Sequence, residues 1–516
     1  MDHIPSIFND VVGPVMRGPS SSHSAAALRI GRMCRDLMDG DPGHVLVKYD
    51  HQDALATTHE SQGSDFGMKG GLLGYEPDDQ RLLHTDEQLI RAGIEIIFEV
   101  TDTGSRLPNH YLVHLRNSED EIQVSALSTG GGMIELIGID GVIVSMKGDC
   151  FETLVFSGDM DFLHSIGKSL SWADQVAFHQ GNRSFAEIKS RQSPEPRWIK
   201  SMRDHPTVQS LRLIEPVLPI RSVKENKLPF QTYKQMLQYN EKRQLTAWEL
   251  ATRYESARGC ITGDEVFNMM KDLYGVLRDA VNEGLKGTHF EDRILGAQSK
   301  LYRNRMEGGN LAGGEALHNI TMYVSALMEV KSSFGTIVAA PTAGSCGTLP
   351  GAVLGVADSL KRGDDVTIRA LLSGCLVGLF IASGSTFSAE IGGCQAECGS
   401  AGGMAAAAIV ELMGGSLEQC MAAASMALQN SLGMICDPIA ARVEAPCLGK
   451  NISAASNALV SANMALAGYD HLIPLDEVIQ TMDIVGKSIP VELRCTALGG
   501  LSVTPAAKEL EKKLKK

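Results

Sequence analysis

The chain has 516 residues and a formal net charge of −14, with 44% hydrophobic and 21% charged residues. This length predicts two to four domains rather than one, and the composition is that of an ordinary folded protein. The acidic balance argues against non-specific binding to nucleic acids or to anionic membranes, because both need a basic surface.

The N-terminus and one apolar stretch bear on where the protein resides. Residues 1–13 include acidic residues and no long apolar run, so we expect no secretory signal and a cytoplasmic protein. The uncharged stretch 371–387 is the best candidate for a membrane span, but its glycine, serine and threonine content favours a buried core helix. The 11 cysteines are therefore expected to be reduced thiols or ligands rather than disulfides.

The hydrophobic pattern divides the chain into three main parts, which together predict an α+β protein. Residues 1–148 alternate helical and strand patterns and are expected to form an α/β domain. Its predicted elements are a helix at 23–40, strands at 44–52 and 95–102, and a hairpin made of 109–117 and 121–130.

Residues 150–221 are expected to form a small module of their own. Its patterns follow in the order β-α-β-β-α-β, which is typical of ferredoxin-like folds. Modules of this kind, the ACT type, commonly bind a small regulatory molecule, and fold analogy alone supports that role here. The polar residues 222–235 predict a linker. Residues 236–516 show the three- and four-residue apolar spacing of long helices, so we expect a mostly helical C-terminal domain.

A serine-rich stretch precedes the first predicted helix. Ser20, Ser21, Ser22 and His23 lie directly before an alanine-rich run. A helix start favours one serine, because its hydroxyl accepts a hydrogen bond from a free backbone N–H group. Three serines exceed that need, and free N–H groups together with hydroxyls suit a carboxylate or a phosphate. The stretch is therefore either a capped helix or the holder of an anionic group of a ligand.

Three glycine-rich segments either let the backbone approach a ligand closely or form plain turns. Their candidate residues are His59, Gln62 and Asp65 in segment 59–74, Gly130 and Gly131 in segment 128–133, and Thr342, Gly344 and Cys346 in segment 340–351.

Two cysteine-bearing segments in the last third of the chain suggest a metal centre. Cys394 and Cys398 share a face if a helix begins near Cys394. Cys436 precedes Asp-Pro, and Cys447 follows a proline. The chain has no CxxC pair and few histidines in this part, so a zinc site would be nearly all thiolate. An iron–sulfur cluster held by thiolates fits this supply of ligands better.

In their joint occurrence these motifs resemble the iron–sulfur-dependent L-serine dehydratases, with the β-type part first and the α-type part second in one chain. The shared segments, in the order of the family, are GPSSSHS, STGGGM, APTAGSCG, AEIGGCQAE, CDP, PCLGKN and LRCTALGGL. Each is weakly specific alone, but together they are highly specific and span nearly the whole chain. The resemblance implies a homodimeric lyase that converts L-serine to pyruvate and ammonia without pyridoxal phosphate.

The resemblance also implies a cofactor. In this family three cysteines hold a [4Fe–4S] cluster and leave one iron without a protein ligand, and the matching positions are Cys394, Cys436 and Cys447. Cys346 and Cys398 would then line the site. An open iron is a Lewis acid that can bind the substrate hydroxyl and make it a better leaving group. In this scheme the serines at 20–22 hold the substrate carboxylate.

One position departs from the family pattern. Many relatives have G-H-x-T-D where this chain has residues 61–65, so Gln62, which cannot take a proton at neutral pH, replaces the usual base. His59 is the nearest substitute, and His23 is the alternative. Cys495, in the segment LRCTALGGL, is expected to be an ordinary thiol, the other interpretation being a plug of the open iron.

Three other functions remain as alternatives. The first is a related β-elimination on L-threonine or L-cysteine. The second is a non-catalytic, cluster-bearing sensor whose module 150–221 binds an effector, although such a sensor would need no second anion site at residues 20–22. The third is a saturated electron-transfer cluster that uses Cys398 or Cys346 as a fourth ligand.

Overall fold

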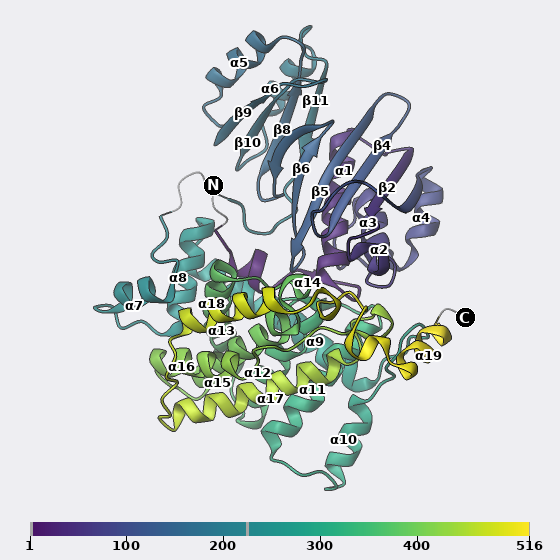
Figure 1. Cartoon of the computed structure of the whole chain (residues 1–516). Helices are drawn as coiled ribbons and strands as arrows, with labels where there is room; N and C mark the ends of the chain where they lie inside the picture. Colours follow the sequence, from purple (N-terminus) through teal and green to yellow (C-terminus); the bar gives the residue numbers. More distant parts are fainter. Residues whose placement is uncertain (1–3, 223–226, 515–516) are drawn as a thin grey trace. The chain divides into compact units, whose positions relative to one another are not determined.

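The computed structural model describes residues 4–222 and 227–514, and the chain divides into two compact units (Figure 1). One unit, which we call the helical unit, comprises Met1–Ser22 and Lys227–Lys516. The other, which we call the sheet unit, comprises His23–Asn226. The segment before His23 thus belongs to the helical unit and not to the α/β domain that the sequence predicts to begin at residue 1.

A six-stranded sheet in the order β3-β2-β4-β5-β6-β7 forms the larger part of the sheet unit. Its strands are β2 (His44–Asp50), β3 (Glu95–Thr101), β4 (His110–Arg116), β5 (Glu121–Gly130), β6 (Met133–Ile139) and β7 (Val142–Met146). Strands β2 and β3 are parallel, and the other neighbouring pairs are antiparallel. The predicted hairpin of β4 and β5 is present, with Val113 opposite Val124.

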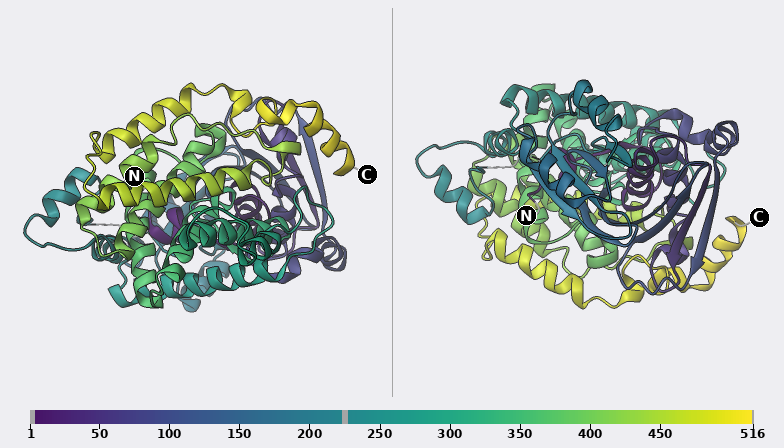
Figure 2. Two further views of the ribbon diagram at one scale, coloured as in Figure 1. Left: turned by 90° about the horizontal axis from the view of Figure 1, so that it is seen from below. Right: turned by 90° about the horizontal axis from the view of Figure 1, so that it is seen from above.

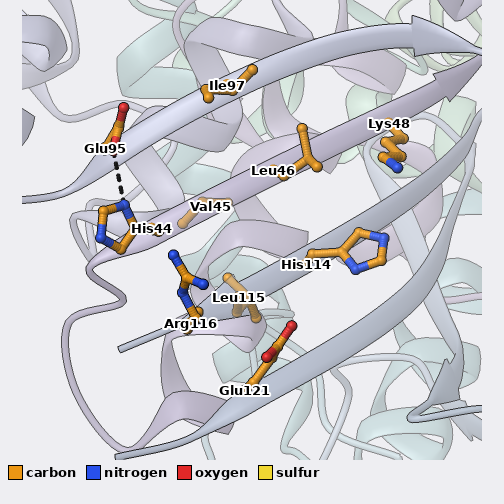
Figure 3. A pocket seen from close by; sticks show the side chains of 10 residues that line it. All are labelled: His44, Val45, Leu46, Lys48, Glu95, Ile97, His114, Leu115, Arg116 and Glu121. Carbon is orange, nitrogen blue, oxygen red and sulfur yellow. Dashed lines mark hydrogen bonds and ion pairs between the residues drawn. The ribbon is translucent and has the colours of Figure 1, made fainter. Parts of the chain in front are cut away.

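Helix α1 (Ala26–Met38) covers one face of this sheet. Its Ile30 and Leu37 pack into one core with inward-pointing strand residues such as Val47 and Val113. Because side chains alternate along a strand, Leu46 points to the other face. There it lines a pocket of about 470 Å³ together with charged residues of β2, β3 and β4 (Figure 3).

Glycines let helix α3 (Ser64–Leu72) lie directly against α1. A Cβ atom at Gly67 would lie 2.0 Å from the carbonyl oxygen of Ser24, and one at Gly71 would lie 2.0 Å from that of Leu28. Any side chain at these positions would force the two helices apart. The glycines of segment 59–74 therefore serve helix packing. In the chain, the short helix α2 (Leu55–Thr58) precedes α3, and α4 (Thr85–Ala92) follows it.

A four-stranded antiparallel sheet in the order β11-β8-β10-β9 completes the sheet unit. Its elements are β8 (Phe151–Phe156), α5 (Met160–Ser169), β9 (Gln175–His179), β10 (Phe185–Ser190), α6 (Pro196–Arg203) and β11 (Ser210–Ile214). This is the β-α-β-β-α-β order predicted for residues 150–221. Val155 and Ile188 face the helices, whereas Leu154 and Phe156 join the core of the six-stranded sheet. The two sheets therefore share a core instead of forming independent domains.

The helical unit consists mostly of helices of eight or more residues, and a mostly helical domain is what the apolar spacing predicts for 236–516. They are α7 (Tyr233–Asn240), α8 (Ala247–Gly259), α9 (Gly263–Lys286), α10 (Ser299–Glu307), α11 (Glu315–Ser332), α12 (Thr348–Ser359), α13 (Asp364–Gly384), α15 (Ser400–Leu412), α16 (Leu417–Gln429), α17 (Cys447–Leu466), α18 (Leu475–Ser488) and α19 (Pro505–Leu514). Helix α17 lies alongside α15 and α16 (Figures 1 and 2). Residues 223–226 of the predicted linker 222–235 lie outside the described residues, and its last residues begin α7.

Helix α13 is the one helix of the described chain that is long and apolar enough to cross a membrane. However, 78% of its most apolar 18-residue window is buried within the protein, where it packs against α15 and α8. Helix α13 is thus a buried core helix, as the sequence predicts for 371–387.

Glu255 anchors the N-terminal segment in the helical unit. Its buried carboxylate accepts hydrogen bonds from the Ser6 hydroxyl at 2.5 Å and from the Ile7 backbone N–H at 2.8 Å. Farther along, β1 (Val15–Met16) pairs antiparallel with β12 (Ile337–Val338). These two contacts explain why the residues before His23 belong to the helical unit.

The anchor makes a pH-dependent contribution to stability that a variant can isolate. Burial raises the pKa of Glu255 to about 7, against the lowering effect of its hydrogen bonds. Because the folded pKa is raised, the protonated carboxyl stabilises the fold fully below about pH 4.5, and this contribution is lost as the pH rises through about 7. Relative to the Glu255→Gln variant, the wild type should lose about 3 kcal/mol of unfolding free energy over that range.

Urea denaturation of the wild type and of Glu255→Gln at pH 5, 6, 7 and 8 measures this difference. Parallel dependence of the two proteins on pH would show that Glu255 does not titrate in this window.

Candidate metal centre

Two cysteines and one carboxylate converge in the helical unit. Among the described residues, the Sγ atoms of Cys394 and Cys436 and a carboxylate oxygen of Glu397 all lie within 4.8 Å of one another. Both cysteines are buried, and Glu397 is half-buried. Cys394 and Cys436 come from segments 42 residues apart in the chain (436 − 394). The fold therefore brings together two of the three cysteines that the resemblance assigns as ligands.

The backbone around Cys394 requires glycine. Gly393, between α14 (Ala389–Gly392) and Cys394, has a φ of +71°, and a Cβ there would lie 2.9 Å from the Met434 carbonyl oxygen. Only glycine adopts this conformation without strain. The Gly-Cys pair of the motif thus lets the Cys394 loop approach the chain just before Cys436.

Gln395 ties the two cysteine loops together. Its backbone N–H donates to the Met434 carbonyl at 3.0 Å, and its side-chain Oε1 accepts from the Gly433 N–H at 2.8 Å. Its Nε2 donates to the Met482 carbonyl of α18 at 2.7 Å. Gln395 is fully buried, so loss of its side chain would leave the Gly433 N–H without its partner. The glutamine of the GCQAE motif therefore fixes the position of Cys394 relative to Cys436.

Cys495 belongs to the same cluster, although its sequence context favours an ordinary thiol. The Cys436 N–H donates to the Leu493 carbonyl at 2.8 Å, and the Cys495 N–H donates to the Cys436 carbonyl at 3.0 Å. The Cys495 side chain is buried with those of Cys394 and Cys436. The segment LRCTALGGL contains Cys495, but only the isolated β-bridge between Arg494 and Cys436 reveals the contact.

Cys447 is the first residue of α17 and is also buried. It is not among the residues whose ligand atoms lie within 4.8 Å of one another. Its surroundings are nevertheless those of the cluster: one turn later Asn451 donates from Nδ2 to the Cys447 carbonyl at 2.9 Å and to the Cys398 sulfur at 3.5 Å. Burial raises the pKa of Cys447, and the negative charge of Cys394 raises it further.

The surroundings of Cys394 favour its thiolate form over the thiol. Hydrogen bonds from the thiols of Cys398 and Cys436 hold its pKa well below the ordinary value, and the charge of Lys450 adds to this effect. The Lys450 ammonium donates at 2.6 Å both to the Ile435 carbonyl and to the Asp437 carboxylate. The hydrogen bond between the thiol of Cys398 and Cys394 shows that the two side chains lie on the same side of the chain, as their spacing predicts. A thiolate is the protonation state in which cysteine binds metal.

This donor set fits an iron–sulfur cluster. Several buried thiols, one of them with a strongly lowered pKa, meet in a cluster that includes no histidine among its described residues. Soft sulfur ligands without imidazole favour iron–sulfur clusters or copper(I) over oxygen-preferring metals.

The serine-rich stretch lies against the glycine-rich loop 340–347 in the helical unit. The Ser21 hydroxyl accepts a hydrogen bond from the Ala343 N–H at 3.1 Å, and the hydroxyls of Ser20 and Ser22 lie 3.2 Å apart. All three serines are buried. The structure forms a single π-helical turn, Ser21–Ala25, before α1 begins at Ala26. The serines therefore do not form the simple cap of a helix that begins at residue 23.

The loop itself faces Glu397. Thr342 donates from Oγ1 to a Glu397 carboxylate oxygen at 2.7 Å, and a Cβ at Gly344 would lie 2.7 Å from the same carboxylate. The fold thus places Thr342 and Gly344 next to the cysteine group through Glu397. Cys346, by contrast, is buried against Met328, with its Sγ 3.8 Å from the Met328 sulfur. Pro350 belongs to the first turn of α12, so the loop ends before it.

His59 forms an ordered dyad with Asp65 in the sheet unit. The His59 Nδ1 lies 2.9 Å from both carboxylate oxygens of Asp65, and its ring stacks on Tyr49 at a centroid distance of 4.8 Å. The Tyr49 hydroxyl donates to Asp65 at 3.1 Å. This arrangement fixes the ring and directs Nδ1–H to the carboxylate, which leaves Nε2 as the nitrogen that can take a proton.

His23 is held differently. It is fully buried, and its Nε2 lies 3.0 Å from the Thr58 Oγ1. Because the Thr58 hydroxyl donates to the Ala54 carbonyl, it accepts from His23.

Gly130 and Gly131 form the tight turn between β5 and β6, with φ values of +103° and +62°. The structure therefore gives these glycines a turn function.

Gln395 generates a prediction about cofactor retention. Gln395→Met fills a similar volume but leaves the Gly433 N–H without its partner and removes the bond to the Met482 carbonyl, so the two cysteine loops should separate. Iron bound after anaerobic reconstitution should be lost to a chelator about tenfold more readily than from the wild type. Gln419→Met is the matched control, because Gln419 also bonds two backbone groups, those of Ser416 and Ala465, but away from the cysteines. Equal iron retention in both variants would contradict the bridging function.

Comparisons with known proteins agree with the geometry. Residues 242–502 match the family model of the serine dehydratase alpha chain. The chain is 38% identical to the probable L-serine dehydratase alpha chain of Bacillus subtilis, over 55% of this chain and 95% of that protein. It is 34% identical to the L-serine dehydratase of Streptomyces coelicolor, over 54% of this chain and 61% of that protein. The protein therefore belongs to the iron–sulfur L-serine dehydratase family.

Proposed function

We propose that this protein is an L-serine dehydratase that converts L-serine to pyruvate and ammonia. The observation that carries the proposal is the meeting of the Cys394 and Cys436 sulfur atoms within 4.8 Å, inside the part of the chain that matches the family model. The serine-rich stretch provides a second, independent support, since its hydroxyls lie against a loop of the same unit.

Cys394, Cys436 and Cys447 would hold a [4Fe–4S] cluster. When bound, such a cluster supplies a Lewis acid for the β-hydroxyl of the substrate. Gln395 and Asn451 position these cysteines by their bonds to the surrounding backbone. Cys495 is buried in the same side-chain cluster as Cys394 and Cys436, and we assign it to the wall of the site.

The helical unit would hold the substrate carboxylate. Ser20, Ser21 and Ser22 supply hydroxyl groups that can donate hydrogen bonds. The loop that contains Thr342 and Gly344 passes close to the Glu397 side chain. Buried donors that are already in place bind an anion without a further loss of side-chain entropy. In this proposal Asp65 orients His59 instead of binding the substrate, and Gly130 and Gly131 form a turn.

The residue that removes the α-proton would be His59. Its Nδ1 is turned to Asp65, whose carboxylate stabilises the imidazolium that forms when Nε2 takes the proton. His23 donates from Nε2 to Thr58, so that nitrogen is already engaged. Loss of the α-proton and of the hydroxyl, as water, gives aminoacrylate. This tautomerises and is hydrolysed to pyruvate and ammonia.

Turnover and iron content together test the proposed function. Anaerobically reconstituted protein should form keto acid from L-serine faster than from L-threonine or L-cysteine, in proportion to its iron. Cys394→Ser, Cys436→Ser and Cys447→Ser should each lose iron and activity, whereas Cys346→Ser should keep both, because Cys346 contacts Met328. Undiminished turnover by iron-free protein would overturn the cluster mechanism. Faster turnover of L-cysteine than of L-serine would show that L-cysteine is the preferred substrate.

Substitution of histidines tests the assignment of the base. His59→Asn should lower kcat by at least about 100-fold while the iron content stays unchanged. His44→Asn is the matched control, because His44 also pairs with a carboxylate, Glu95 at 2.8 Å, but on the exposed face of the sheet. If His59→Asn keeps most of its kcat and His23→Asn does not, the assignment moves to His23. The homodimer, the cytoplasmic location and the regulatory role of 150–221 stay predictions.

A further inference from the structure

Glu390 places a carboxylate on the serine-rich stretch. It belongs to α14, four residues before Cys394, and is half-buried. Its Oε1 accepts a hydrogen bond from the Ser22 hydroxyl at 3.0 Å, and its Oε2 accepts one from the Ser388 hydroxyl at 2.6 Å. Ser22 in turn lies 3.2 Å from Ser20. A negative charge is therefore fixed beside the hydroxyls that we assign to the substrate carboxylate.

A second carboxylate nearby has a different orientation. Glu397 accepts from Thr342 and lies within 4.8 Å of the sulfur atoms of Cys394 and Cys436. Burial first, and then the negative charges of Cys394 and Glu390, raises the pKa of Glu397 to about 8. The two carboxylates are thus electrostatic neighbours, but Glu397 faces the cysteines whereas Glu390 faces the serines.

A carboxylate is a poor neighbour for a second anion. Hydroxyl groups bind a substrate carboxylate well, but the charge of Glu390 would repel it, and this repulsion is strong where water is scarce. An α-amino acid resolves the conflict, because it carries an ammonium group next to its carboxylate. The ammonium has three donors and no acceptor, and its strongest partner is a carboxylate.

We propose that Glu390 binds the α-ammonium group of the substrate while the serine hydroxyls bind its carboxylate. This inference rests on the proposed function and deepens it, since it assigns the selection of amino acids to one side chain. An acid that has a hydroxyl in place of the ammonium meets the charge of Glu390 without compensation and is rejected. A site built to bond a charged group discriminates strongly against an analogue that lacks it.

Binding of two unreactive analogues tests the assignment without turnover. L-Alanine has both charged groups of the substrate, and L-lactate has a hydroxyl in place of the ammonium. Calorimetric titration of anaerobically reconstituted wild type should show at least about tenfold tighter binding of L-alanine than of L-lactate. Glu390→Gln should bind the two within about threefold of each other, because the amide neither attracts an ammonium nor repels an anion.

Glu411→Gln is the matched control. Glu411 is also a glutamate that accepts from a serine hydroxyl of the helical unit, that of Ser373 at 2.9 Å, but it lies at the end of α15. This variant should keep the wild-type preference. If Glu390→Gln loses its iron or fails to fold, Glu390→Asp keeps the charge on a shorter side chain, and its preference for L-alanine should fall about threefold.

Three results would overturn the inference: a wild type with no preference for L-alanine, a folded Glu390→Gln that keeps the tenfold preference, or an unchanged preference in Glu390→Asp when Glu390→Gln does not fold. Failure of the proposed function has a different signature. In that case L-serine yields no pyruvate, while the preference for L-alanine and its loss in Glu390→Gln still report on Glu390.

Discussion

The cysteine centre depends on the buried side-chain amide of Gln395. One amide group joins the loop of Cys394, the loop that leads to Cys436 and the middle of α18, through the Gly433 N–H and the Met482 carbonyl. A buried amide that satisfies backbone groups from different segments is costly to remove, since each of those groups would remain desolvated without a partner. Hydrogen bonds within the protein therefore fix the position of the Cys394 sulfur relative to the Cys436 sulfur without the help of a metal.

Charge is balanced around this centre by neighbouring residues of the same unit. The Cys394 thiolate accepts from two thiols and is stabilised by Lys450, whose ammonium also pairs with Asp437. Buried charges without such partners would be neutralised or would destabilise the fold. Asp437 in addition accepts from the Leu501 N–H at 2.9 Å, so it links the C-terminal segment to the chain next to Cys436.

The serines and the histidine candidates belong to different units, and the boundary falls between the adjacent residues Ser22 and His23. Each set is positioned within its own unit. The N-terminal segment is held in the helical unit by Glu255 and by the pairing of β1 with β12, which brings Ser21 to the Ala343 N–H. In the sheet unit, Tyr49 and Asp65 orient His59, and close packing of α3 on α1 through Gly67 and Gly71 supports Asp65.

Local pattern was sufficient for much of the fold. The period of apolar residues predicts the long helices after residue 236 and the order of elements in 150–221, because local spacing determines which face a helix or strand can bury. The motifs likewise indicate Cys394 and Cys436. Only the tertiary structure decided that residues before His23 join the helical unit, that the two sheets share a core, that Cys495 is buried with Cys394 and Cys436, and that Glu390 bonds Ser22. These facts depend on contacts between residues far apart in the chain, such as Ser6 with Glu255 and Ser22 with Glu390, and no local period encodes them.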